Sequence, residues 1–213
     1  EVGIDALRAC CAVDPVKPWH ILAITFTNKA AGELKSRLSA TLGEESQDIM
    51  AATFHSFCAR VLRREIEALG YEKNFTIYDT DDSLRLIREA CKALRIDEKN
   101  FTPRSLLSMI SRAKDKLQNP VQMRAAEPGN FRAEVGARVY EEYQKLLKSA
   151  NAVDFDDLIV LTVRLFEQNP DILEKYQDRY TYIMVDEYQD TNHAQYRLIN
   201  LLAARRRNIC VVG

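Results

Sequence analysis

Four short apolar runs, two toward each end of the chain, constrain the fold of this sequence more than any other feature. Residues 21–26 and 49–53 form the first pair, and residues 182–185 and 209–212 form the second. Runs of four to six apolar residues are typical of buried strands. Helical spacing of apolar residues follows three of the four runs, as in parallel strands joined by helical crossovers. The pattern therefore predicts an α/β fold with a parallel sheet and flanking helices.

The middle of the chain has no comparable run. Apolar residues recur at helical spacing from Thr80, Thr102-Pro103 marks a second helix start, and residues 131–149 form a third helical segment. Residues 118–130 contain proline and glycine and are expected to be a connector. We therefore expect an all-helical insertion within one α/β domain. We expect the chain to divide into residues 1–74 for the first part of the sheet domain, 75–150 for the insertion and 151–213 for the second part of the sheet domain.

Helix boundaries follow from capping residues. Asn28, Ser56 and Thr80 precede helical segments and are expected to be N-caps, because their side chains can accept a backbone N–H. Gly43 and Gly70 are expected to end the first two helices, since glycine tolerates a positive φ.

Polar clusters follow three of the four predicted strands directly. They are residues 25–28, 53–56 and 186–190. The carboxyl ends of parallel strands lie along one edge of a sheet, where ligands bind. These three clusters, far apart in the sequence, are therefore expected to converge on one crevice.

The third cluster has the form of a nucleotide-hydrolysing site. Asp186 ends an apolar strand and can hold Mg²⁺ through water, and Glu187 can accept a proton from an attacking water. A strand end followed by a helix cap explains the same two residues without catalysis.

The first two clusters favour a groove for single-stranded nucleic acid. Hydroxyl, amide and backbone N–H groups at helix N-termini suit phosphates, and a phenylalanine ring can stack on a base. The alternative is that both phenylalanines are core residues, that the polar residues only cap helices, and that the histidine is an ordinary polar residue. The candidates are Thr25, Phe26, Thr27, Asn28, Thr53, Phe54, His55 and Ser56.

A second acidic group, Asp154, Asp156 and Asp157, has two interpretations. With Asp186 and Glu187 it could form a two-metal nuclease cluster. A capping box explains Asp154 and Asp157 without metal, and no histidine or lysine lies nearby in the sequence to complete a nuclease signature.

Several classes of protein are excluded by composition. No glycine precedes a lysine and no GxGxxG occurs, so the chain contains neither a GxxxxGK phosphate loop nor a complete Rossmann fingerprint. It has no run of 18 apolar residues and no signal-peptide pattern, so we expect no membrane association. Five scattered cysteines without CxxC spacing favour a reduced, cytoplasmic protein.

Net charge gives little indication of a partner. It is −1 for the whole chain, and residues 101–124 hold five basic residues and one acidic residue. A solvated helix face explains this local excess as well as DNA does.

Four motifs in order resemble the UvrD/PcrA/Rep helicases of superfamily 1, which translocate on single-stranded DNA. They are ILAITFTNKAAGEL at 21–34, ATFHSFCARVLR at 52–63, VDFDDL at 153–158 and YIMVDEYQDTNHAQY at 182–196. The resemblance extends from about Lys17 to Gly213. It implies a partial RecA-like subdomain 1A with the helical subdomain 1B inserted in it.

The resemblance also implies roles for individual residues. Asp186 matches the Mg²⁺-binding aspartate, and Glu187 matches the glutamate that activates water. Gln189 and Asp190 complete the DExxQD motif and are expected to link the ATP site to the DNA-contacting residues. Residues 25–28 and 53–56 match the motifs that contact DNA, with Phe26 on a base and His55 near the strand.

Two departures limit what the resemblance implies. Residues 1–20 contain nothing like the family's GKT phosphate loop, and the family's second RecA-like domain is absent. We therefore expect a fragment whose full-length parent is an ATP-dependent DNA helicase using ATP and Mg²⁺, in repair or replication. The fragment itself is expected to be inactive and to bind no cofactor. Expected partners of the parent are single-stranded DNA, junctions of single- and double-stranded DNA, and repair proteins.

Two other functions stay open. One is the helicase portion of an AddA/RecB-type helicase–nuclease, and the other is a non-enzymatic module that binds DNA or a partner.

Overall fold

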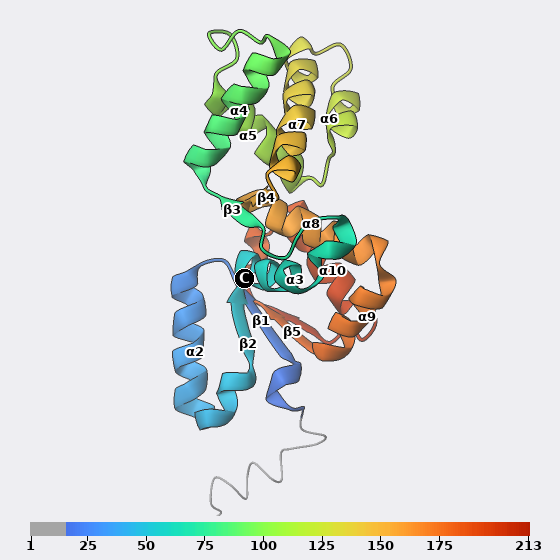
Figure 1. Ribbon diagram of the computed structural model, residues 1–213. Helices are drawn as coiled ribbons and strands as arrows, with labels where there is room; N and C mark the ends of the chain where they lie inside the picture. Colours follow the sequence, from blue (N-terminus) through green and yellow to red (C-terminus); the bar gives the residue numbers. More distant parts are fainter. Residues whose placement is uncertain (1–15) are drawn as a thin grey trace, which may run out of the picture.

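A four-stranded parallel sheet is the centre of the larger part of the molecule (Figure 1). The computed structural model describes residues 16–213. The prediction of a parallel α/β sheet with flanking helices is confirmed. Its strand order is β2-β1-β5-β6, with β1 at Ile21–Thr25, β2 at Met50–Thr53, β5 at Tyr182–Val185 and β6 at Ile209–Val211.

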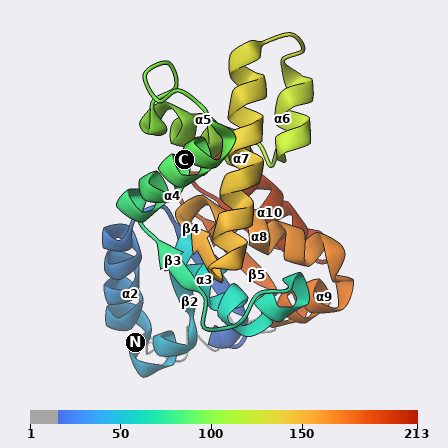
Figure 2. The ribbon, with the colours of Figure 1, turned by 45° about the horizontal axis from the view of Figure 1, so that its top comes forward.

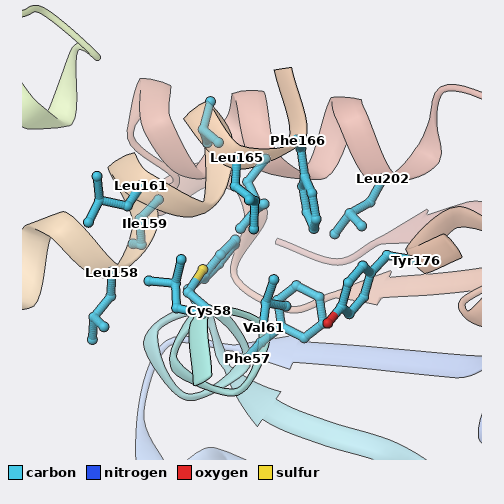
Figure 3. Packing of buried hydrophobic residues seen from close by; sticks show 14 of the residues in the cluster. Phe57, Cys58, Val61, Leu158, Ile159, Leu161, Leu165, Phe166, Tyr176 and Leu202 are labelled. Atoms are coloured by element: carbon cyan, nitrogen blue, oxygen red, sulfur yellow. The ribbon is translucent and has the colours of Figure 1, made fainter. Parts of the chain in front are cut away.

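Helices pack on this sheet through apolar faces. Side chains of α3 and α8 interlock above the strands, with aromatic rings of α8 and α9 alongside (Figure 3). Leu22 and Ile24 of β1 are buried in the same cluster. The short 3-10 segments are η1 (Pro18–His20), η2 (Gly43–Asp48), η3 (Ile66–Leu69) and η4 (Tyr188–Asp190). The helices of this part are α2 (Asn28–Leu42), α3 (Phe54–Glu65), α8 (Phe155–Gln168), α9 (Pro170–Arg179) and α10 (His193–Ala203).

The remaining helices form a separate lobe with its own apolar core (Figures 1 and 2). Tyr143, Leu106 and Ile110 are among its fully buried residues. The predicted connector at 118–130 is wrong in one respect, because seven of its residues form a helix that begins at an Asn119–Gln122 capping box. The lobe helices are α4 (Thr80–Leu94), α5 (Pro103–Asp115), α6 (Pro120–Ala126) and α7 (Phe131–Ser149).

A second, two-stranded parallel sheet lies where the lobe meets the main domain. β3 (Thr76–Tyr78) pairs with β4 (Ala152–Asp154) in register from Thr76 with Ala152 to Tyr78 with Asp154. The expectation that residues 75–150 are all helical is therefore wrong at its first residues. The two chain segments that enter and leave the lobe are hydrogen-bonded to each other.

Helix N-caps lie one or three residues earlier than expected. Thr27, Thr53 and Asp79 accept the capping N–H groups in place of Asn28, Ser56 and Thr80. Each of these three residues has a side-chain oxygen and extended backbone, which are the two properties that an N-cap needs. The expected helix end at Gly43 is confirmed, with φ 68°. Gly70, with φ 74°, ends the 3-10 segment η3 rather than α3, which ends at Glu65.

Cysteine burial is mixed in the part of the chain that the structure describes. Cys58 and Cys91 are buried and Cys210 is exposed, and all three are free thiols. Cys10 and Cys11, together with most of the segment expected to lack a phosphate loop, lie outside the described residues. Among the described helices, none has the length and apolar character needed to cross a membrane.

Candidate functional site

The three polar clusters converge at one edge of the sheet, as the sequence predicts. In the parallel register Thr25 lies opposite Thr53, and Ile24 lies opposite Val185. The backbone N–H of Asp186 donates to the carbonyl oxygen of Ile24 at 3.0 Å. Segments more than 130 residues apart in the sequence therefore end side by side.

The acidic loop after β5 is held in a tight turn. Glu187 has φ 50° and ψ 42°, a left-handed conformation that costs a non-glycine residue energy and is concentrated at functional sites. Its Oε2 accepts a hydrogen bond from Gln189 Nε2 at 2.6 Å. Asp186 is half-buried and lines a shallow pocket of about 230 Å³ with Glu33 and Arg37 of α2.

Residues of this loop fit part of an Mg²⁺–ATP site. Mg²⁺ is held in proteins by one or two carboxylates, with water and phosphate oxygens completing its octahedron. Asp186 can supply such a carboxylate, although no group of three protein ligands for a metal occurs within residues 16–213. The chain contains no GxxxxGK loop to hold the phosphates, so its own residues provide only the acidic side of the site.

Most hydroxyls of the first two clusters are used in local structure. Thr27 Oγ1 accepts from Ala30 N, and Thr25 Oγ1 donates to the carbonyl oxygen of Thr27. Thr53 Oγ1 accepts from Ser56 N at 3.2 Å and lies 2.9 Å from Ser56 Oγ. Thr25 and Thr53 are buried, whereas Asn28 is exposed. Thr27 is exposed as well, but its hydroxyl oxygen caps α2.

The two phenylalanines of these clusters differ in accessibility. Phe54 is only 1% exposed and belongs to the main core, so its ring cannot stack on a base. The expectation of DNA contact by this side chain is wrong because the first turn of α3 directs it into the core. Phe26 is half-buried and meets Phe54 edge to face, with ring centroids 5.3 Å apart.

Sequence analysis missed an exposed aromatic at this edge. Phe155, the first residue of α8, is 56% exposed and stacks on His55 with ring centroids 3.8 Å apart and planes 19° apart. The signal was present in VDFDDL: Asp154 and Asp157 form a capping box that turns inward, which leaves the phenylalanine between them outside.

His55 is uncharged at neutral pH. Its ring is partly buried, and this desolvation lowers the pKa of His55 to about 4. The His55–Phe155 pair therefore presents two flat, neutral rings, which suit a base better than a phosphate.

The second acidic group does not form a metal cluster. Lys114 Nζ lies 2.6 Å from Asp154 Oδ2 and 2.8 Å from Asp157 Oδ1, and the lysine is fully buried. No lysine lies nearby in the sequence, but one from α5, 40 residues earlier, reaches the site through the fold. The capping-box interpretation is confirmed.

The comparisons with known proteins agree with this geometry. The family model for the UvrD/REP helicase N-terminal domain matches residues 8–213. The chain is similar to the ATP-dependent DNA helicase PcrA of Bacillus subtilis, at 50% identity, and to proteins of the same name from Staphylococcus epidermidis (49%) and Staphylococcus aureus (46%). Each similarity covers 93% of this chain and 27% of the relative's length. The chain therefore belongs to the UvrD/REP helicase N-terminal domain family.

Proposed function

We propose that this chain is the part of an ATP-dependent DNA helicase that holds one strand of DNA beside an acidic ATP-site loop. The observation that carries the proposal is the convergence of Asp186 and Glu187 with the partly buried ring of His55 and the exposed ring of Phe155 along one sheet edge. The relatives named above are ATP-dependent DNA helicases, and the similarity covers only 27% of their length. Translocation on single-stranded DNA and unwinding are proposals for the whole protein.

In this proposal the acidic loop serves nucleotide hydrolysis. Mg²⁺–ATP supplies the phosphoryl-transfer chemistry when it is bound. Asp186 would hold the metal through water, and Glu187 would accept the proton of the attacking water. The Gln189–Glu187 hydrogen bond supports a role for Gln189 in orienting that carboxylate.

The DNA path would follow the ends of β1 and β2. Asn28 offers an exposed polar side chain beside the N-terminus of α2, which suits a phosphate. Phe26 and the His55–Phe155 pair offer ring faces or edges to bases. Thr25, Thr27, Thr53 and Ser56 would act through the helix starts that they build.

Finer parts of the proposal concern partners, place and division of the chain. Junctions of single- and double-stranded DNA and repair proteins are proposed partners, and the cytoplasm is the proposed location. Separate apolar cores support the division into sheet domain at 1–74 and 151–213 and helical insertion at 75–150.

Binding of a fluorescent oligothymidylate to the 213-residue chain tests the DNA proposal. Stacking on an aromatic ring contributes about 1–3 kcal/mol per base, so Phe155→Ala should weaken binding roughly 5- to 150-fold. Phe131→Ala is the matched control, because Phe131 is also the first residue of a helix and is 68% exposed, but lies in the lobe. Equal affinities of the two variants would remove the His55–Phe155 pair from the DNA site.

A further inference from the structure

Lys114 is a fully buried cation at the junction between the lobe and the main domain. It comes from the last turn of α5, and its two carboxylate partners lie at the N-cap and third residue of α8. Tyr143 OH of α7 donates to the same oxygen of Asp154 at 2.9 Å. One ammonium group therefore joins helices from both apolar cores.

The position of this cation is favourable for one helix and unfavourable for the other. A positive charge stabilises a helix C-terminus, as at α5, and opposes the dipole at a helix N-terminus, as at α8. The carboxylates of Asp154 and Asp157 offset the second effect. They also hold the first turn of α8 in a fixed relation to α5, because a buried ion pair is costly to break.

The next residue along α5 holds another helix start. Asp115 Oδ1 accepts a hydrogen bond from Asn192 Nδ2 at 2.6 Å, and Asn192 is the N-cap of α10. Consecutive residues of one lobe helix thus contact the first turns of α8 and α10. The second contact lies only a few residues after Asp186 and Glu187.

The aromatic pair lies directly against this junction. His55 and Phe155 line one small cavity of about 140 Å³ together with Lys114, Asp115 and Asn192. Phe155 directly follows Asp154 in the chain. The carboxylate that binds Lys114 and the exposed aromatic ring therefore belong to neighbouring residues. A rotation of this turn would move the ring away from His55.

We propose that Lys114 is a positioning residue, which holds the first turn of α8 so that Phe155 stacks on His55. The value of this stack for DNA binding rests on the proposed function, whereas the positioning itself does not. Lys114 contacts no solvent and would act only through Asp154 and Asp157.

The proton spectrum of the His55 ring reports the stack without DNA. Ring protons above the face of Phe155 are shifted upfield, and Phe155→Leu gives the unstacked reference. The chain has three histidines, so His55→Gln assigns the resonances. Lys114→Met keeps the length of the side chain and should remove most of the upfield shift. Leu106→Ala, a buried change on the same helix that spares the cation, should retain it.

A second variant keeps the test decisive if Lys114→Met does not fold. Lys114→Met with Asp154→Asn and Asp157→Asn leaves no unpaired charge, and asparagine still caps helices. The upfield shift should again be lost. A folded Lys114→Met or triple variant with the full shift would overturn the proposal.

Oligothymidylate binding by the same variants separates this inference from the proposed function. A lost shift with affinity lowered 5- to 150-fold supports both. A lost shift with unchanged affinity supports the positioning role and contradicts the role of the pair in DNA binding.

Discussion

Removal of one hydroxyl from the buried junction should measurably destabilise the molecule. Tyr143 is 0% exposed, and its OH donates to Asp154 Oδ2 at 2.9 Å. A hydrogen bond to a charged group contributes about 1.5–3 kcal/mol, and the loss leaves a buried carboxylate with one donor fewer. Tyr143→Phe should therefore lower the free energy of unfolding by that amount, since the ring and its packing are unchanged.

The assay is thermal unfolding followed by circular dichroism, with a control on the same helix. For a chain of about 200 residues, each kcal/mol shifts Tm by about 2–4 °C, so Tyr143→Phe should lose roughly 3–12 °C. Tyr140 has a buried ring on α7 without a hydrogen bond to another described residue, so Tyr140→Phe should change Tm by less than about 2 °C. Equal Tm values for the two variants would refute the view that the junction is held by hydrogen bonds to Asp154.

Two further predictions concern nucleotide and pH. Because the chain has no GxxxxGK loop, it should release no more phosphate from ATP than its Glu187→Gln variant does. ATP hydrolysis by the unchanged chain that Glu187→Gln abolishes would contradict this expectation. The pKa of His55 is lowered to about 4, below the 6.5 of an unfolded histidine, so the unfolded state binds more protons between these values and stability falls as pH falls through them. Urea titrations at pH 7.5 and pH 5 measure this loss of unfolding free energy. The loss should be about 1 kcal/mol smaller in His55→Gln than in the unchanged chain, allowing for the partly exposed ring. Equal losses would argue against a desolvated His55.

Local pattern was sufficient to predict the main sheet and the convergence of its strand ends. The run at 21–26 reflects β1, which is buried from Leu22 to Thr25. The run at 182–185 predicted a strand correctly, although Tyr182 and Met184 are exposed on one face of β5. The helix at 131–149 was predicted at its observed bounds, and the structure adds that Asn130 caps it.

Long-range pairing explains what the sequence did not reveal. β3 is three residues long and pairs with a strand about 75 residues later, so neither strand has a local signature. Lys114 lies in a basic stretch that resembles a solvated helix face, and only the fold brings Asp154 and Asp157 to it. Phe54 is buried and Phe155 is exposed, a difference that the sequence did not reveal because burial depends on which way a helix turn faces.

The most direct test of the DNA-binding edge is a map of backbone amide shifts on titration with an unlabelled oligothymidylate. We expect the changes to be concentrated at residues 26–28, at 53–56 and around Phe155, with weaker changes at Asp186. Changes should diminish with added salt, because phosphate contacts release counterions. Changes confined to the lobe helices α4 to α7, or none at all at DNA concentrations that saturate nonspecific binding, would contradict this expectation.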